Sequence, residues 1–115
     1  MMAIDRQYVE KGWLDGAMHH LDLLCKESRQ YEDEGDIPPT DKGMKSAKEL
    51  MSQVAKSSPP QIAISVNGEI LFSWDTDKDG LTASVTTDGK VRFSINHAPV
   101  DKNIFVRYLS TNIAA

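Results

Sequence analysis

Four short segments in the second half of the chain alternate apolar and polar residues, and turn-forming residues separate them. The segments run from Ile62 to Val66, Ile70 to Trp74, Leu81 to Thr86 and Val91 to Ile95. A period of two puts successive side chains on opposite faces of a strand, so each segment predicts one buried and one solvent-facing side. Together the segments predict a sheet over about residues 61–96.

The connections between these segments are short, which predicts antiparallel neighbours. Asn67-Gly68 is a strong hairpin signal, because a type I′ turn needs a positive φ at both central residues. Thr87-Asp88-Gly89 marks a second tight turn. Leu71 is the main apolar residue expected on the outer face. The expected buried face consists of Ile62, Ile64, Val66, Ile70, Phe72, Trp74, Leu81, Ala83, Val85, Val91, Phe93 and Ile95.

Two amphipathic helices are expected before the sheet, over about residues 6–29 and 41–55. The first carries an apolar stripe at spacings of three and four, made of Leu14, Met18, Leu21 and Cys25. Gly12 and Gly16 would share one side of this helix, where a second backbone could approach closely. Thr40 is expected to cap the second helix. The stripe of the second helix contains Met44, Ala47, Leu50, Met51 and Val54.

The two helical stripes are the only apolar faces available to cover the sheet. We therefore expect an α+β fold, with an N-terminal helical hairpin packed on one face of a four-stranded antiparallel meander. At 115 residues, the chain is expected to form a single domain, 1–115. The tail, residues 97–115, has two interpretations. Apolar residues from Ile104 onward favour a short helix after Asp101, whereas Phe105–Leu109 could instead form a fifth strand.

Composition argues against several classes of protein. The contents of 40% hydrophobic and 26% charged residues are ordinary for a globular domain. Cys25 is the single cysteine, so no internal disulfide is expected, and no apolar run approaches the roughly 20 residues that span a bilayer. The N-terminal residues lack the apolar stretch of a signal peptide. A net charge of −4 is unfavourable for general nucleic-acid binding. We expect a cytoplasmic protein with no membrane or nucleic-acid partner.

The stretch Asp75–Gly80 matches the start of a calcium-binding loop, in which carboxylates at alternate positions converge on a cation. The candidate ligands are Asp75, Asp77 and Asp79. The match ends at Thr86, where a bidentate Glu is expected, and strands rather than helices flank the loop. The alternative interpretation is a solvated hairpin loop made of turn-forming residues.

No motif predicts catalysis or a bound cofactor. His19 and His20 are neighbours on a helix, so their side chains diverge by about 100° and cannot bind one metal as an i, i+4 pair. Cys25 lies on the apolar stripe, where a buried hydrophobic role is expected rather than a nucleophile. The sequence has no Gly-rich phosphate loop and no G-x-S-x-G element. An enzyme that uses His19 or His20 with a loop carboxylate is kept as a third hypothesis.

Two surfaces are candidates for binding another macromolecule. The acidic segment Glu32-Asp33-Glu34 could face a basic partner, although such runs are commonly solvated loops. Residues Gln61–Val66 form the preferred edge for pairing with another chain, because few charges guard them. The alternative is that the outer face is an ordinary solvated sheet face and that the edge is covered within the molecule. The outer face is expected to display small, weakly charged side chains, namely Ser65, Leu71, Ser73, Thr82, Ser84, Thr86, Arg92 and Ser94.

A series of turn and cap residues follows the same order as in a known group of proteins. These residues are Gly35, Pro38-Pro39, Thr40, Pro59-Pro60, Asn67-Gly68, Phe72-Ser73-Trp74 and Asp88-Gly89. With them, the segment from about Tyr31 to Ile95 resembles a loose group of small uncharacterised bacterial proteins, often found in mobile or phage-derived regions. The resemblance implies a bacterial or phage origin and brings no catalytic residues.

The leading hypothesis is a non-enzymatic interaction protein that binds another protein. An inhibitor of a host complex is one member of that class. A homodimer is also expected, through the sheet edge or the Gly12/Gly16 side. The alternative is a small-ligand or calcium-binding module that uses the Asp75–Gly80 loop. The expected interaction residues are Glu32, Asp33, Glu34, Ser65, Ser73, Ser84 and Arg92.

Overall fold

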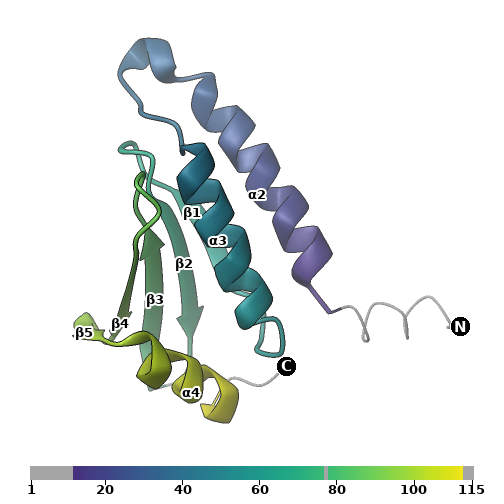
Figure 1. The fold of residues 1–115 in the computed structure, drawn as a ribbon, viewed down its shortest axis with the longest axis vertical. Coiled ribbons are helices and arrows are strands. Elements are labelled where there is room, and N and C mark those ends of the chain that lie inside the picture. The colour runs from purple at the N-terminus through teal and green to yellow at the C-terminus, as the bar shows by residue number, and fades with distance from the viewer. Residues whose placement is uncertain (1–11, 77, 113–115) are drawn as a thin grey trace, which may run out of the picture.

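A computed structural model describes residues 12–76 and 78–112 and shows an α+β fold (Figure 1). The elements in chain order are α2 (Leu14–Arg29), η1 (Glu32–Glu34), α3 (Asp41–Gln53), β1 (Gln61–Ile64), β2 (Ile70–Asp75), β3 (Gly80–Val85), β4 (Val91–Ile95), β5 (Ala98–Val100) and α4 (Lys102–Asn112). The strands form one antiparallel sheet in the order β1-β2-β3-β4-β5. The predicted α+β class and antiparallel meander are confirmed, and the sheet has five strands rather than four.

The helices lie on one side of the sheet (Figure 1). The antiparallel pair α2 and α3 forms the predicted helical hairpin, with α2 against β1 and α3 over β2 and β3. The last described helix, α4, crosses one end of the sheet and contacts β4. No helix among the described residues covers the opposite face.

The core lies between the helices and the inward side chains of the strands. Its aromatic centre is Phe105 of α4, whose ring centroid lies 4.9 Å from that of Phe93 and 5.6 Å from that of Trp74. Burying a Phe or Leu side chain contributes about 1.5–3 kcal/mol, so this contact holds α4 on the sheet. The other buried residues of the core are Leu21, Ala47, Leu50, Met51, Val54, Ile70, Phe72, Leu81, Ala83, Val85 and Leu109.

The β1–β2 hairpin has a three-residue loop rather than the predicted type I′ turn. At the β1–β2 connection, the N–H of Gly68 donates to the Ser65 carbonyl (3.1 Å), and the N–H of Ser65 donates to the Glu69 carbonyl (2.9 Å). Gly68 has a φ of +81°, whereas Asn67 is not among the residues with positive φ. A turn followed by one left-handed residue has this pattern. The type I′ prediction for Asn67-Gly68 is therefore wrong.

A turn of the type I′ kind lies instead between β4 and β5. Asn96 and His97 both have positive φ, +52° and +69°, and they separate the paired residues Ile95 and Ala98. Positive φ at both central residues is the requirement of that turn. The resulting fifth strand contradicts the expected four-stranded sheet, and the alternative strand at Phe105–Leu109 is wrong because these residues lie in a helix. The predicted helix after Asp101 is confirmed as α4.

The first helix begins later than predicted. Gly12 has a φ of +66°, outside the helical region, so one continuous helix over residues 6–29 is excluded. The residues before Gly12 lie outside the described part of the chain. Trp13 precedes α2, and its indole N–H donates to the Ser57 carbonyl (2.7 Å). The prediction that Gly12 and Gly16 share one side of a helix is therefore wrong.

The second helix begins as predicted. The Thr40 hydroxyl oxygen accepts the N–H of Gly43 (3.0 Å), which makes Thr40 the N-cap. The same hydroxyl donates to the Thr87 carbonyl, so the cap also joins α3 to the β3–β4 hairpin. α3 ends at Gln53, slightly before the predicted end at residue 55.

Val66 is the exception among the residues predicted to face the core. β1 ends at Ile64, and Val66 lies in the hairpin loop with 63% of its surface exposed. Strand alternation applies only while the backbone is extended, so it does not predict the direction of a loop side chain. The Val66 carbonyl accepts the N–H of Ile37 (2.8 Å), which joins the loop before α3 to this hairpin.

Gly68 offers a test of that junction. A Cβ at Gly68 would lie 2.8 Å from the Pro38 carbonyl oxygen and 2.9 Å from that of Ile37, whereas a Cβ at Gly35 would have no neighbour within 4 Å. Both glycines have positive φ. We expect Gly35→Ala to lower the free energy of unfolding by about 1 kcal/mol and Gly68→Ala by about 3 kcal/mol, because only the second adds a backbone clash. Urea unfolding measures both, and equal losses would contradict the packing described for this loop.

Candidate interaction surface

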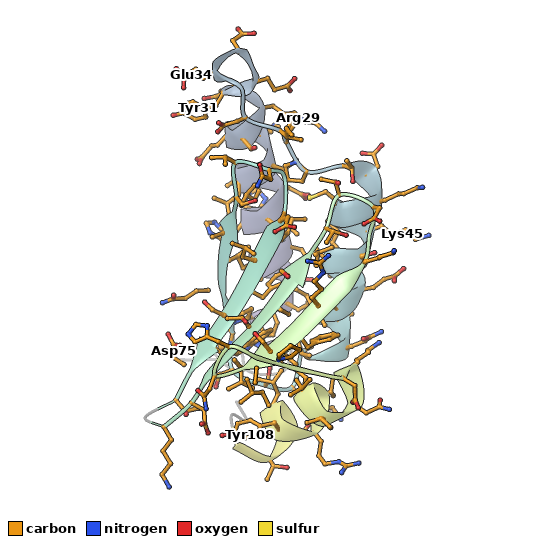
Figure 2. All side chains as sticks on the ribbon, turned by 90° about the vertical axis from the view of Figure 1, so that its left-hand side faces the viewer. Arg29, Tyr31, Glu34, Lys45, Asp75 and Tyr108 are labelled. Carbon is orange, nitrogen blue, oxygen red and sulfur yellow. The ribbon has the colours of Figure 1, made fainter. Side chains whose placement is uncertain are left out.

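The face of the sheet without helices carries two rows of side chains that cross the strands. Figure 2 looks onto this face. The strand register places Ala63, Leu71, Ser84 and Arg92 in one row, and Gln61, Ser73, Thr82, Ser94 and Pro99 in the other. Of the predicted interaction residues, Ser73, Ser84 and Arg92 therefore lie on one surface, which we call the outer face. Ser73 and Ser84 are half-buried, and Arg92 is exposed.

The outer face is slightly hollowed where β1, β2 and β3 meet. The hollow has a volume of about 500 Å³, and its lining includes Ala63, Leu71, Ser73 and Ser84. Leu71 is 37% exposed, which confirms it as an apolar residue on this face. Arg92 is the only charged residue in the two rows. The two rows therefore offer three apolar side chains (Ala63, Leu71 and Pro99), several hydroxyl groups and one guanidinium group, and Glu69 also lines the hollow.

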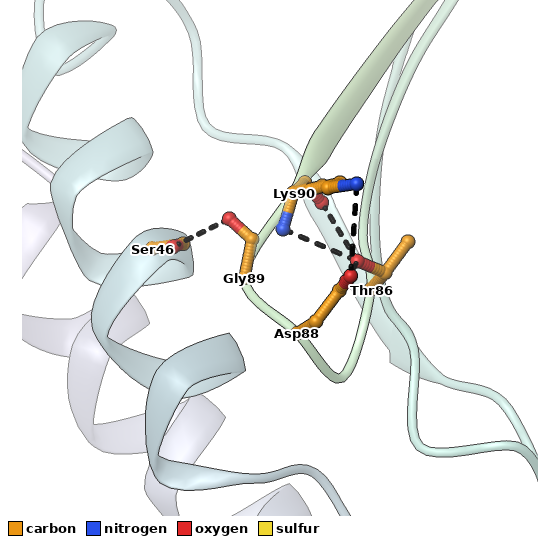
Figure 3. A network of polar contacts seen from close by, with 5 residues as sticks. All are labelled: Ser46, Thr86, Asp88, Gly89 and Lys90. Atoms are coloured by element: carbon orange, nitrogen blue, oxygen red, sulfur yellow. Dashed lines mark hydrogen bonds and ion pairs between the residues drawn. The ribbon is translucent and has the colours of Figure 1, made fainter.

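Ser65 lies outside the two rows, in the β1–β2 turn. Its hydroxyl oxygen accepts the N–H groups of Asn67 (3.2 Å) and Glu69 (3.1 Å). Thr86 has the equivalent role in the β3–β4 turn, where its oxygen accepts the N–H of Lys90 (3.1 Å; Figure 3). Ser and Thr stabilise turns in this way. The hydroxyl groups of Ser65 and Thr86 are thus used inside the molecule.

Hydrogen bonds within the β3–β4 turn stabilise it, and another hydrogen bond joins the turn to α3 (Figure 3). The Ser46 hydroxyl donates to the Gly89 carbonyl (2.8 Å), and the Thr86 hydroxyl donates to the Asp88 carboxylate. The Thr86 hydrogen bond is the main cause that lowers the pKa of Asp88 below its ordinary value, and Lys90, 3.9 Å away, acts in the same direction. Asp88 is exposed, so this pKa shift describes the turn rather than a binding site.

The acidic segment forms η1, between α2 and α3. Glu32, Asp33 and Glu34 are all exposed, and Figure 2 shows Glu34 at the tip of the molecule, beyond the ends of the strands. Two apolar side chains beside the segment are also exposed, Tyr31 by 48% and Ile37 by 51%. The structure does not bring the acidic segment onto the outer face, so the predicted interaction residues belong to two separate surfaces.

The loop after β2 is organised by Thr76. Its hydroxyl oxygen accepts the N–H groups of Lys78 (3.1 Å) and Asp79 (2.8 Å). This arrangement is typical of a turn closed by its own side chain. Asp77, one of the three candidate calcium ligands, lies outside the described residues.

The carboxylate of Asp79 links this loop to two other elements. One oxygen accepts the side-chain amide of Asn96 (2.6 Å), and the other accepts the hydroxyl of Tyr108 on α4. In the described part of the chain, no group of three His, Cys, Asp or Glu side chains could hold a metal ion. The calcium hypothesis stays a prediction, and the contacts of Asp79 favour a structural role for this carboxylate.

The histidines and Cys25, the remaining candidates, do not come together in one site. His19 and His20 are exposed on α2, and His97 is exposed in the β4–β5 turn. Cys25 is only 6% exposed and acts as a small buried hydrophobic residue, as predicted. The hypothesis of an enzyme that uses a histidine stays a prediction without supporting geometry.

Sequence reasoning missed a groove beside β4. The groove has a volume of about 710 Å³ and lies between α3 and the junction of β5 with α4. Its lining includes Glu49, Gln53, Val91, Phe93 and Lys102. The groove exists because β5 is too short to cover the first residues of β4. No local signal in the sequence predicts that length, since it depends on where α4 begins to pack.

Asp79 and Asp75 form a matched pair for testing the structural role of the loop. Asp75 is exposed and accepts no hydrogen bond from the described residues, whereas Asp79 accepts two. We expect Asp79→Ala to lower the free energy of unfolding by about 2 kcal/mol, because it removes two hydrogen bonds to a charged group. Asp75→Ala should be close to neutral. Thermal unfolding of the two variants measures these losses. The same experiment on the wild type with millimolar calcium tests the alternative, and a rise in Tm would contradict a purely structural role for Asp79.

Comparisons with known protein families, with curated proteins and with solved structures gave no match to this chain. Among the described residues, no helix has the length and apolar character needed to cross a membrane. What the protein does must therefore be inferred from its own surfaces.

Proposed function

We propose that the chain is a non-enzymatic protein that binds another protein through the outer face of its sheet. The observation that carries this proposal is the one-sided covering of the sheet, which leaves the two rows of side chains in contact with solvent. The solvated face of an antiparallel sheet is polar. Here the two rows are mostly small polar side chains, with one charged residue, Arg92, and one exposed leucine, Leu71.

Two residues of the outer face, Leu71 and Arg92, suit a protein–protein interface. The centres of such interfaces are apolar, depleted in Lys, Glu and Asp and enriched in arginine, whereas serine and alanine are not enriched there. Leu71 provides an apolar contact near the hollow, and Arg92 lies at the far end of the same row. Short side chains such as Ser73 and Ser84 lose little conformational entropy when a partner covers them. A flat partner surface with a small apolar projection would fit this face.

The setting of this interaction is part of the proposal. The resemblance to small bacterial proteins of mobile or phage-derived regions supports a bacterial or phage origin, and we propose a cytoplasmic location with it. An inhibitor of a host complex is one form that such a binding protein could take. A homodimer belongs to the same proposal, because a sheet edge can pair with a second copy.

Two exposed leucines provide the test. Leu71 lies on the outer face (37% exposed) and Leu23 lies on α2 (43% exposed). We expect Leu71→Glu to abolish capture of the partner from a lysate of the native or host cell, because the change places a charge at the centre of the contact. Quantitative mass spectrometry of the captured proteins measures this. With the purified partner, the affinity should fall by about tenfold or more.

Leu23→Glu is the matched control, since it makes the same chemical change at a similarly exposed position. Circular dichroism should show that both variants are folded. If both variants capture the same protein as the wild type, or if Leu23→Glu alone loses it, the outer face is not the binding surface.

The acidic segment would add a second contact to a basic region of the partner. Replacing Glu32, Asp33 and Glu34 by lysine should weaken partner binding, and replacing the same three residues by their uncharged amide counterparts should have an intermediate effect. The loss should shrink at high salt, because exposed charges are screened within about 8–10 Å. Calorimetric titration at two salt concentrations measures this. Unchanged affinity in the lysine variant would restrict the interaction to the outer face.

A further inference from the structure

The two edges of the sheet differ in what they offer to another strand. In an antiparallel ladder, alternate residues direct both backbone groups toward one neighbour, and the residues between them direct both groups to the other side. Val100 and Ala98 of β5 pair with β4, so the residue that faces outward is Pro99. Proline has no N–H, and the edge formed by β5 is therefore unable to donate. Proline at this position protects an edge from strand addition.

The edge formed by β1 lacks this protection. The hydrogen bond from the Ser65 N–H to the Glu69 carbonyl sets the phase of the ladder, so Ala63 and Gln61 face β2. The backbone groups of Ile62 and Ile64 consequently point away from the sheet. Among the described residues, no other backbone group binds them.

The residues on either side of this edge have no complete pair of free backbone groups to offer to another strand. Val66 lies in the loop after the strand, and its carbonyl accepts the N–H of Ile37 (2.8 Å). Pro60 precedes the strand in the same alternation and has no N–H. The available edge is thus restricted to Ile62 and Ile64, with Ala63 between them. This short and centred edge allows only a few registers for an incoming strand.

We propose that the β1 edge pairs with β1 of a second copy of this chain, antiparallel about a two-fold axis that passes beside Ala63. Ile62 then exchanges its backbone hydrogen bonds with Ile64 of the second copy, and Ile64 with Ile62, while Ala63 lies opposite Ala63. This register uses all of the free backbone groups and none of those already bound. This proposal specifies the geometry of the homodimer that is part of the proposed function. Its evidence comes from the backbone groups of the β1 edge and does not depend on partner binding.

The side chains at this edge are compatible with self-pairing. Residues 60–66 contain no charged side chain, so the two-fold axis brings no like charges together. Ile62 and Ile64 lie on the core side but remain half-exposed. The second copy would place isoleucine beside isoleucine and cover the part of these side chains that the monomer leaves in water. Ala63, which projects from the outer face, is small enough to allow close approach.

The difference between the two edges also explains why such pairing would stop at two copies. A contact between identical edges is closed, because each copy uses the one open edge among its described strands. Beside Val91, part of β4 is not covered by β5, but it lies in the groove and the next carbonyl, that of Gly89, already binds Ser46 (2.8 Å). That opening is too short for a strand. Dimerisation would join the two five-stranded sheets and present their outer faces as one continuous surface.

Cross-linking of the purified protein tests the register. Ala63 would face Ala63 of the second copy as a non-hydrogen-bonded pair with Cα atoms about 4.5 Å apart, a distance that a disulfide can span. We expect Ala63→Cys to form a disulfide-linked dimer under mild oxidation. Thr82→Cys, exposed on the same face but in β3, should stay monomeric on a denaturing gel, and the native Cys25 is buried and should not interfere. Absence of the Ala63→Cys cross-link would overturn the proposed register.

Association without cross-linking tests the edge itself. Ala63→Lys should weaken dimerisation in sedimentation experiments by roughly fivefold, because it places two ammonium groups opposite each other, whereas Thr82→Lys should not. Hydrogen exchange at the Ile62 and Ile64 amides should slow as the wild-type concentration rises. A wild-type protein that stays monomeric at high concentration, with concentration-independent exchange at both amides, would overturn the proposal. These measurements use the protein alone, so their outcome is separate from the loss of partner capture by Leu71→Glu.

Discussion

Burial of one face of the sheet under the helices is the interaction on which the other features of this protein depend. The contact of Phe105 with Phe93 and Trp74 brings α4 onto the same side as α2 and α3. Because the described helices α2, α3 and α4 all pack on this side, none of them is available to cover the opposite side. The strands accordingly alternate, with apolar side chains toward the helices and small polar groups toward solvent. A fold of this kind is stable as two layers and still presents a flat surface.

Polar contacts determine how the helices sit on the sheet. Thr40 caps α3 and also donates to Thr87, and the hydroxyl of Ser46, further along the helix, donates to the Gly89 carbonyl. Each contact of this kind contributes about 1 kcal/mol. At the other end, the indole groups of Trp13 and Trp74 donate to the neighbouring carbonyls of Ser57 and Ser58 (2.7 and 2.8 Å). The directional bonds therefore fix the position of α3 along the strands, which burial alone would leave adjustable.

The two functional inferences use different parts of the same sheet. Partner binding uses side chains on the outer face, where Leu71 and Arg92 share a row. Self-association uses backbone groups at the β1 edge, where Ile62 and Ile64 have no partner within the described residues. The two are compatible, because the edge lies at the side of the outer face and leaves it uncovered. Pairing would enlarge the surface offered to a partner without changing its chemistry.

The sequence predicted the features that depend on neighbouring residues. Alternation identified the four main strands, spacing of apolar residues identified the helices, and Thr40 identified the start of α3, because each pattern reflects backbone geometry over a few residues. Chain-distant contacts decided the rest. Asn96 and His97 adopt positive φ in a turn that forms because β5 pairs with β4. The Asp79 carboxylate accepts a hydrogen bond from Tyr108 because α4 packs beside this loop. Likewise, Pro99 and Ile62 acquire their opposite roles only once the strand order makes β5 and β1 the two edges of the sheet.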